Sequence, residues 1–217
     1  MTRQQVSGGK RVALPGHVTN SIASTVEFTK RRELIRMRAE IERLREENER
    51  LAALAYRDAL TGLRNRRCFT ERLSEELCRL KRNPEGALSV ICIDVNDFKR
   101  LNDTEGHAAG DAALQAVAEV LEMLVRAEDL VCRVGGDEFV VLLPDTQRDQ
   151  AERVVERIRT HAPALAGVGL GRRGLAVGLS SWVYGDDELT LQSRADDEMY
   201  ADKRSAQGNC QPLVSAA

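Results

Sequence analysis

The chain has 217 residues, of which 42 % are hydrophobic and 30 % are charged, and its formal net charge is −2. This length fits one globular domain with an appendage, and the hydrophobic content is enough for a proper core. The near-neutral charge excludes the basic field of many nucleic-acid-binding proteins, and no apolar run reaches the roughly 18 residues of a membrane span.

Residues 1–30 are polar, include Pro15 and Gly16, and show no sustained periodicity. This composition predicts a flexible arm, with at most a short helical stretch near residues 21–28. Between residues 31 and 57, apolar side chains recur at alternating spacings of three and four, which is the heptad pattern of a coiled coil. The a and d positions are Leu34, Met37, Ile41, Leu44, Asn48, Leu51 and Ala55.

The flanking positions of residues 31–57 favour a parallel partner helix. Acidic g positions would face basic e positions of the partner, namely Glu33 and Glu40 at g, and Arg38 and Arg45 at e. Asn48 at an a position costs stability but favours a two-stranded parallel register. The alternative is a single amphipathic helix that packs on its own domain. The narrow stripe and the paired charges predict a homodimer through this segment.

Residues 58–67 read Asp-Ala-Leu-Thr-Gly-Leu-Arg-Asn-Arg-Arg. The Thr-Gly step predicts the end of the preceding helix, and the arginine-rich turn leads to an amphipathic helix over residues 68–81. Taken alone, this segment is an ordinary helix junction with solvated arginines.

The apolar run at residues 87–93 predicts a buried strand that ends on Asp94. A carboxylate at the end of a central strand is a recurrent metal ligand, because rigid backbone holds it in place. The polar residues that follow predict a loop, which opens into a helix over residues 111–127. Asp111 is a candidate N-cap of that helix, and His107 is a candidate loop-packing residue.

A strand over residues 130–134 leads into residues 135–139, Gly-Gly-Asp-Glu-Phe, and an apolar run follows. This pattern predicts a hairpin whose glycines adopt the positive φ of a tight turn. Two carboxylates beside bare backbone suit a metal-bound phosphate. Taken alone, the motif fits an acidic surface turn equally well.

Beyond the hairpin, a cap signal at residues 144–146 predicts a helix over residues 148–161. A strand over residues 175–179, extended through Trp182, and a helix over residues 189–204 are predicted next. The β-α-β-β-α-β alternation, without a dinucleotide glycine fingerprint, predicts an α+β fold whose mostly antiparallel sheet is flanked by helices.

The five cysteines are Cys68, Cys78, Cys92, Cys132 and Cys210, and no two form a Cys-x-x-Cys pair. An odd, scattered set predicts reduced, mostly buried thiols instead of a disulfide framework or a zinc site. The first residues, Met-Thr-Arg-Gln-Gln, are not typical of a signal peptide, so we expect a cytoplasmic protein.

Together these motifs resemble the GGDEF family of diguanylate cyclases. The junction, the segment from Asp94 to Asp111, the Gly-Gly-Asp-Glu-Phe signature, and Ala195-Asp196 with Tyr200 stand in the family's order. The resemblance implies the palm-like, nucleotidyl-cyclase-like GGDEF fold. The expected divisions are a flexible arm at 1–30, a coiled-coil helix at 31–57, the GGDEF domain at 58–208 and a loose tail at 209–217.

The resemblance implies synthesis of cyclic dimeric GMP (cyclic di-GMP) from two GTP molecules, with release of two pyrophosphates. A site of this kind holds one GTP, so two domains must face each other, and tethering by the coiled coil would help them meet. Two Mg²⁺ or Mn²⁺ ions per active site are the implied cofactors.

The resemblance also implies roles for individual residues. The metal ligands are Asp94, Val95 through its carbonyl, Asp137 and Glu138, and the catalytic residues are Glu138, Asp137 and Lys99. Asn102 and Asp111 would read the guanine edge, whose donors adenine lacks. The other substrate contacts are Phe98, His107, Gly135, Gly136 and Lys203.

Arg126-x-x-Asp129 stands where many family members bind the product for feedback inhibition, with Arg157 favoured over Arg153 as a secondary contact. Arginines suit bidentate contacts with phosphate and guanine. The alternative is an ordinary Arg–Asp ion pair at a helix end.

The chain departs from the family pattern at Asn96, where a second acid is common, and at Gln207, where an arginine would contact phosphate. Gln207 leaves open whether GTP binds more weakly or whether Arg204 substitutes. No sensor domain is recognisable, so the activating signal stays open and an upstream sensor protein remains a candidate partner. A non-catalytic cyclic di-GMP receptor and a GTP-responsive scaffold are the competing function classes; the intact signature favours the enzyme.

Overall fold

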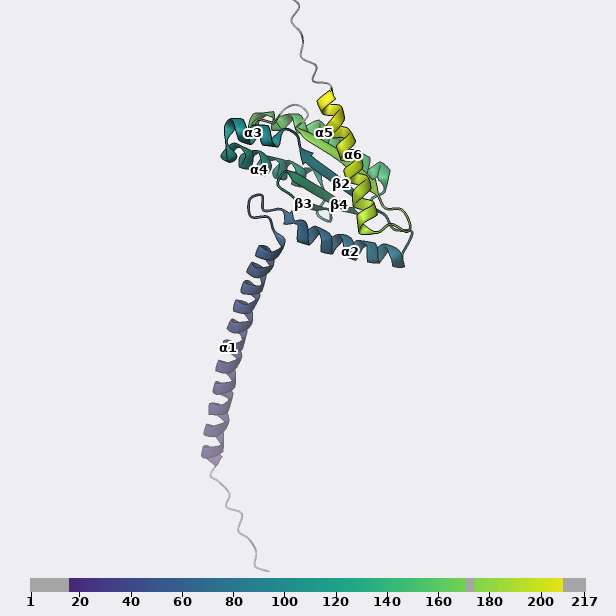
Figure 1. The fold of residues 1–217 in the computed structure, drawn as a ribbon. Coiled ribbons are helices and arrows are strands. Elements are labelled where there is room, and N and C mark those ends of the chain that lie inside the picture. Colours follow the sequence, from purple (N-terminus) through teal and green to yellow (C-terminus); the bar gives the residue numbers. More distant parts are fainter. Residues whose placement is uncertain (1–15, 171–173, 209–217) are drawn as a thin grey trace, which may run out of the picture. The chain divides into compact units, whose positions relative to one another are not determined.

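The structure is a computed structural model in which residues 16–170 and 174–208 are described (Figure 1). The predicted tail at 209–217, Cys210 and the first half of the predicted arm lie outside these residues. The chain divides between Ala52 and Ala53 into a helical unit and a globular unit. Among the described residues, no helix is both long enough and apolar enough to cross a membrane.

The helical unit is formed by α1 (Gly16–Tyr56), whose last residues belong to the globular unit. The helix begins well before residue 31, so the assignment of residues 16–30 to a flexible arm is wrong. No glycine or proline lies between Gly16 and Gly62 to interrupt the helix, and Val18, Ile22 and Val26 recur at helical spacing in this stretch. In the single chain, the large apolar side chains of the predicted seam are exposed: Leu34, Met37, Ile41, Leu44 and Leu51.

The globular unit contains a five-stranded sheet with the order β1-β3-β4-β2-β5. β1 pairs with β3 in parallel and the other pairs are antiparallel, which confirms the predicted, mostly antiparallel sheet. β1 was not predicted, because a segment of two residues carries no periodicity. The strands are β1 (Arg64–Asn65), β2 (Leu88–Val95), β3 (Leu130–Arg133), β4 (Glu138–Pro144) and β5 (Leu175–Ser181).

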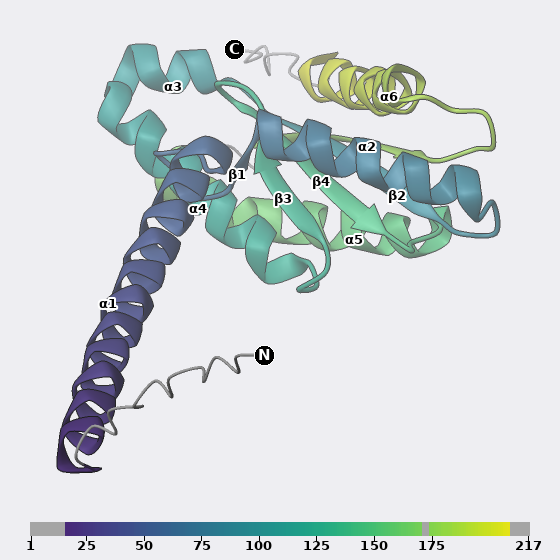
Figure 2. The ribbon, with the colours of Figure 1, turned by 90° about the horizontal axis from the view of Figure 1, so that it is seen from below.

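Helices cover both faces of this sheet (Figure 2). One face packs against α2 and α6, and the other packs against α4, α5 and the 3₁₀ helix η1. The helices are α2 (Arg66–Arg82), α3 (Phe98–Glu105), α4 (His107–Leu124), α5 (Arg148–His161), η1 (Ala162–Val168) and α6 (Glu188–Gly208).

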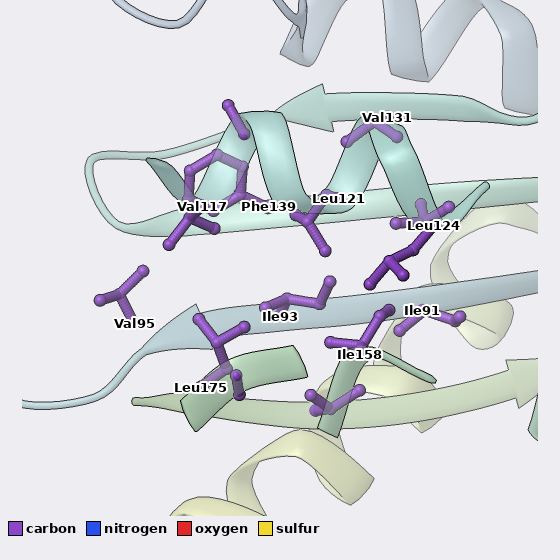
Figure 3. Close-up of a cluster of buried hydrophobic side chains, with 14 of the residues drawn as sticks. Ile91, Ile93, Val95, Val117, Leu121, Leu124, Val131, Phe139, Ile158 and Leu175 are labelled. Carbon is purple, nitrogen blue, oxygen red and sulfur yellow. The ribbon is translucent and has the colours of Figure 1, made fainter. Parts of the chain in front are cut away.

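Strand β2 lies inside the sheet and alternates its side chains between two cores. Ile91, Ile93 and Val95 belong to the larger core, which α4 and α5 close (Figure 3). Cys92 belongs to the smaller core on the side of α2 and α6. By the same alternation Asp94 faces α2 and α6. Core packing therefore decides from which face Asp94 can meet a ligand.

The segment predicted as a polar loop after Asp94 contains α3 and the start of α4. Gly106, whose φ is 85°, separates the two helices, and Leu101 is the buried residue of α3. A single buried position gives no periodicity from which the helix could be predicted. Asp111 lies inside α4 and is exposed, so its prediction as an N-cap is wrong.

The edge strand β5 is covered by carboxylates from α6. The N–H of Val177 donates to Asp202 Oδ2 at 2.9 Å, and the N–H of Leu179 donates to Glu198 Oε2 at 3.1 Å. These bonds satisfy backbone donors that the sheet itself leaves open on this side.

Four cysteines fall among the described residues, and all four are free. Cys92 and Cys132 are buried, Cys68 is half-buried and Cys78 is exposed. Burial raises the pKa of the Cys132 thiol to about 12, so this thiol stays uncharged at neutral pH. These thiols behave as small core residues, apart from Cys78.

We expect Gly178→Ala to lower the free energy of unfolding by about 1–3 kcal/mol, because overpacking separates helix and strand. A Cβ at this position would meet the backbone of Ala195 and Met199 in α6. Urea unfolding followed by circular dichroism measures the change. The control is Gly167→Ala, because a Cβ there meets no atom within 4 Å. Equal losses in both variants would contradict the close approach of α6 to β5.

Candidate active site

The candidate site begins with the register between β2 and β4. Asp94 is the Cα partner of Glu138, and the N–H of Val95 donates to the carbonyl of Asp137 at 3.0 Å. Paired residues of neighbouring strands project to the same face, so both carboxylates lie on the side of α2 and α6. The register thus places the backbones of Asp94 and Val95 opposite those of Glu138 and Asp137, the four residues predicted as metal ligands.

Asp94 is a buried carboxylate with a basic partner. Its side chain is only 11 % exposed, and Lys203 Nζ donates to Asp94 Oδ1 at 2.6 Å. Burial raises the pKa of Asp94, the bond from Lys203 lowers it, and the nearby charge of Asp137 raises it again; the net direction is upward. Burial is therefore the main reason why the pKa of Asp94 is raised, and the bond from Lys203 offsets it only in part.

Glu138 is more exposed than Asp94 and has a looser partner. Arg66 Nη2 lies 3.6 Å from Glu138 Oε2, and both side chains are about half exposed or more. The same guanidinium donates through Nε to the carbonyl of Val134 at 2.7 Å. Arg66, at the start of α2, therefore supports the hairpin and its acid together.

The two signature glycines do not have the positive φ that was predicted for the turn. A Cβ on Gly135 would instead meet the carboxylate of Glu138, whereas a Cβ on Gly136 meets no atom within 4 Å. Gly135 therefore makes room for the Glu138 side chain. The N–H groups of Val134 and Gly135 both donate to the Glu138 carbonyl, at 2.9 and 3.3 Å, and this closes the turn.

Arg133 links the turn to the junction that follows α1. Its guanidinium donates twice to the carbonyl of Gly136, at 3.2 and 2.7 Å, and once to Asp58 Oδ1 at 3.0 Å. Thr61 also donates to Asp58 through its N–H and its hydroxyl. Burial would raise the pKa of Asp58, but the bonds from Thr61 and Arg133 lower it below its ordinary value.

The junction is therefore more than a turn with solvated arginines, as it was first interpreted. Its Asp58 and Arg66 reach the hairpin through partners that lie far along the chain. Nothing in the local pattern of residues 58–67 indicates such partners, so sequence reasoning gave these residues no role in the site.

The residues predicted to read a base lie on α3 and α4. A Cβ on Gly110 would meet Asn102 Oδ1 and the ring of Phe98, so this glycine lets both side chains of α3 approach α4. Asp111 is the next residue on α4 and is exposed, and His107, the first residue of α4, and Lys99 on α3 are exposed as well. These side chains are available to a ligand without rearrangement of the core.

The carboxylate oxygens of Asp94 and Glu138 fit a metal ion that takes its remaining ligands from a substrate and from water. Among the described residues, no group of three or more His, Cys, Asp or Glu side chains is arranged to hold a metal. Mg²⁺ is usually held by one or two carboxylates together with phosphate oxygens and water, so Asp94 and Glu138 suffice for that type of site.

A cavity of about 430 Å³ opens beside Glu138. Its wall combines apolar side chains of the smaller core with polar groups from α2 and α6. Polar members of this wall are Arg66, Thr70, Gln192, Asp196 and Asp197. Glu138 is therefore reachable by a small ligand from this side.

A second cavity, of about 410 Å³, contains Arg126 and Asp129. Arg57 and Arg64 also line it, and sequence reasoning had assigned no ligand-binding role to either. The N–H of Arg126 donates to Asp129 Oδ2 at 2.9 Å. In the described part of the chain no ion pair joins the Arg126 guanidinium to Asp129, so the interpretation as an ordinary helix-end ion pair is wrong.

The charge of Arg157 acts on Asp129 only weakly. Burial raises the pKa of Asp129, while the bond from Arg126 and the charges of Arg126 and Arg157 act in the opposite direction. Arg126 and Asp129 therefore share this cavity, whereas Arg157 is not among the residues that line it. The chain also departs from the family pattern near the end of α6, where Gln207 replaces an arginine and Arg204 is the candidate substitute. The Arg204 guanidinium lies over the ring of Tyr200 at 5.0 Å, and the side chain of Gln207 lies outside the described residues.

Residues 55–209 match the family model described as "Diguanylate cyclase, GGDEF domain". The response regulator PleD of Caulobacter vibrioides is 42 % identical over 158 residues, which cover 70 % of this chain and 35 % of PleD. Diguanylate cyclase A of Treponema denticola is 30 % identical over 189 residues, which cover 84 % of this chain and 51 % of that protein. The chain thus spans between about a third and a half of the length of these relatives.

Solved structures show the same fold. The coiled coil and GGDEF domain of DgcB from Caulobacter crescentus, in complex with c-di-GMP, match with a TM-score of 0.72 and 26 % identity, covering 82 % of this chain and 95 % of that chain. SiaD from Pseudomonas aeruginosa, in complex with its activator SiaC, matches with a TM-score of 0.65 and 31 % identity, covering 87 % and 74 %. The fold expected from the sequence is confirmed.

We expect Arg133→Met to lower the free energy of unfolding by about 1–3 kcal/mol, because it removes the guanidinium that donates to Asp58 and to the carbonyl of Gly136. Arg153→Met is the control, since Arg153 is an exposed arginine of α5 without such partners. Urea unfolding at neutral pH measures both. A loss no larger than that of the control would show that the link does not stabilise the fold.

The pH dependence of the stability of Asp58→Asn, compared with that of the wild type, shows whether ionised Asp58 stabilises the fold. Because the folded-state pKa of Asp58 is lowered, its ionised form stabilises the fold above the unfolded pKa of about 3.9. That stabilisation is lost as the pH falls through the folded-state pKa. The difference in stability between wild type and Asp58→Asn should therefore be constant near neutrality and shrink in acid.

Proposed function

We propose that this chain, which belongs to the GGDEF-domain family of diguanylate cyclases, condenses two GTP molecules into cyclic di-GMP and releases two pyrophosphates. The observation that carries the proposal is the pairing of Asp94 with Glu138 beside the bare glycine turn. Two carboxylates on rigid strands, next to backbone that a phosphate can approach, suit phosphoryl transfer.

Asp94, Glu138 and the carbonyl of Val95 would hold Mg²⁺ or Mn²⁺, with two ions per site, and Asp137 adds negative charge nearby. The metal would neutralise charge on the phosphates and make the attacking hydroxyl more acidic. Gly136 would let a phosphate approach on the side of its missing Cβ, because no atom lies within 4 Å of that position. Lys99 and Lys203 would bind the triphosphate as point charges.

Asn102 and Asp111 would select guanine over adenine. A carboxylate accepts from the imino and amino donors of guanine, and an amide side chain both donates and accepts. Phe98 and His107 lie on the same pair of helices and would complete the base site. The exposure of Asp111 and His107 supports this role, since neither side chain is occupied by the core.

Dimerisation through α1 would supply the second GTP. Each domain holds one substrate, so ring closure needs two domains related by a two-fold axis. The exposed apolar seam of residues 31–57 suits a parallel coiled coil, and such a tether raises the effective concentration to the order of millimolar.

Feedback inhibition would use the second cavity. Arg126 presents a guanidinium free of ion pairs among the described residues, and Asp129 lines the same cavity. Arg157 would add a secondary contact. The same cavity supports the second candidate function, a receptor that binds cyclic di-GMP without making it.

Incubation of the purified protein with GTP and Mg²⁺, followed by mass analysis, tests the reaction. We expect cyclic di-GMP from the wild type and a loss of at least about a hundredfold in Glu138→Gln, because a metal ligand is removed. Asp197→Asn is the matched control: its carboxylate lines the cavity beside Glu138 but lies outside the strand pair. Absence of product from a wild-type dimer that is free of bound cyclic di-GMP would refute the cyclase.

Arg126→Ala separates inhibition from catalysis. We expect its rate to stay constant as cyclic di-GMP accumulates, whereas the wild-type rate falls, because the guanidinium that would bind the product phosphate is gone. Progress curves with added cyclic di-GMP measure this, and Arg82→Ala, at an exposed arginine in the last turn of α2, should behave like the wild type. Equal inhibition of Arg126→Ala would place the regulatory site elsewhere.

A further inference from the structure

Each carboxylate of the proposed metal site is held by a basic side chain of the protein itself. Lys203 from α6 lies 2.6 Å from Asp94, with the two side chains 28 % and 11 % exposed. Arg66 from α2 lies 3.6 Å from Glu138, with side chains 67 % and 48 % exposed. The first pair is close and mostly buried, whereas the second is loose and solvated.

We infer that Lys203 is an internal counter-ion that occupies Asp94 until a divalent metal binds, and that metal binding releases Lys203 to the triphosphate. The inference rests on the proposed function and adds a second role for the same lysine. Arg66 is not assigned this role, because exposed pairs contribute little and are screened by solvent.

The charges at Asp94 make the two cations exclusive. A divalent ion bound to Asp94 would lie within a few ångströms of an ammonium that donates to the same carboxylate, and this repulsion is strong where water is largely excluded. A lysine ammonium sits on a flexible stem of four carbons, so it can leave without movement of the backbone. Its neighbour Asp202 is bonded to the N–H of Val177 in β5, which holds this turn of α6 in place.

Because Lys203 and the metal compete for Asp94, the binding of the metal is linked to the binding of the nucleotide. A metal that arrives alone must displace Lys203, and a triphosphate that arrives alone finds Lys203 engaged by Asp94. When both arrive, Asp94 exchanges the ammonium for the metal and Lys203 exchanges the carboxylate for phosphate. Each ligand therefore strengthens the binding of the other, by the reciprocity that governs linked sites.

The test is a titration of the full chain with Mn²⁺ in the absence of nucleotide. Electron paramagnetic resonance measures the free Mn²⁺ at each step. Asp94→Asn identifies the signal that belongs to this site. We expect Lys203→Met to bind Mn²⁺ about tenfold more tightly than the wild type, because the competing charge is removed. Lys203→Arg keeps the charge and should remain near the wild type. Lys81→Met is the matched control, because Lys81 is an exposed lysine in the last turn of α2, outside the proposed site, and its Mn²⁺ affinity should not change.

An unchanged or weaker Mn²⁺ affinity in Lys203→Met would overturn the inference, since it would show that Lys203 does not compete with the metal. Tighter binding in Lys203→Met together with a wild type that makes no cyclic di-GMP would retain the counter-ion and refute the cyclase. Absence of any Mn²⁺ signal that depends on Asp94 would overturn both the metal site and the counter-ion.

Discussion

The register between β2 and β4 is the constraint on which the site depends. Their antiparallel pairing runs from Leu88 with Pro144 to Asp94 with Glu138. A slip of one residue would turn Glu138 to the opposite face of the sheet, away from Asp94. Because β2 is buried on both faces, such a slip would also misplace the apolar residues of both cores. The packing energy of the whole domain therefore holds two acids at one point.

Two acids placed this close together repel each other, and basic side chains from three different elements surround them. Lys203 comes from α6, Arg66 from α2 and Arg133 from β3. Arg133 stabilises the turn through Asp58 and a carbonyl, while the other two meet the acids themselves. Under the proposed function this difference has a chemical meaning, because a bond to the backbone could persist through turnover, whereas a counter-ion on a metal ligand would have to leave when the metal binds.

The parts of the fold with a strong local signal were predicted, and those determined by distant contacts were not. The apolar run of β2 and the amphipathic pattern of α5 appear in the structure close to their predicted positions. The helix α3 was missed because its polar sequence buries only Leu101. The turn at Gly135 was predicted for the wrong reason, since the glycine is required by the Glu138 side chain and not by φ. The site residues came from motif resemblance; their partners Asp58, Arg66 and Arg133 required the tertiary structure.

The two edges of the sheet limit how copies of this protein can associate. At one edge β1 offers two residues, and at the other the outward N–H groups of Val177 and Leu179 are occupied by carboxylates of α6. In the described chain, neither edge presents a long row of open donors to which another strand could add. Strand addition at these edges is therefore disfavoured, which leaves loops and helix surfaces for contacts between globular units. Such contacts separate readily, and the proposed reaction, in which two domains meet and then part, would need that property.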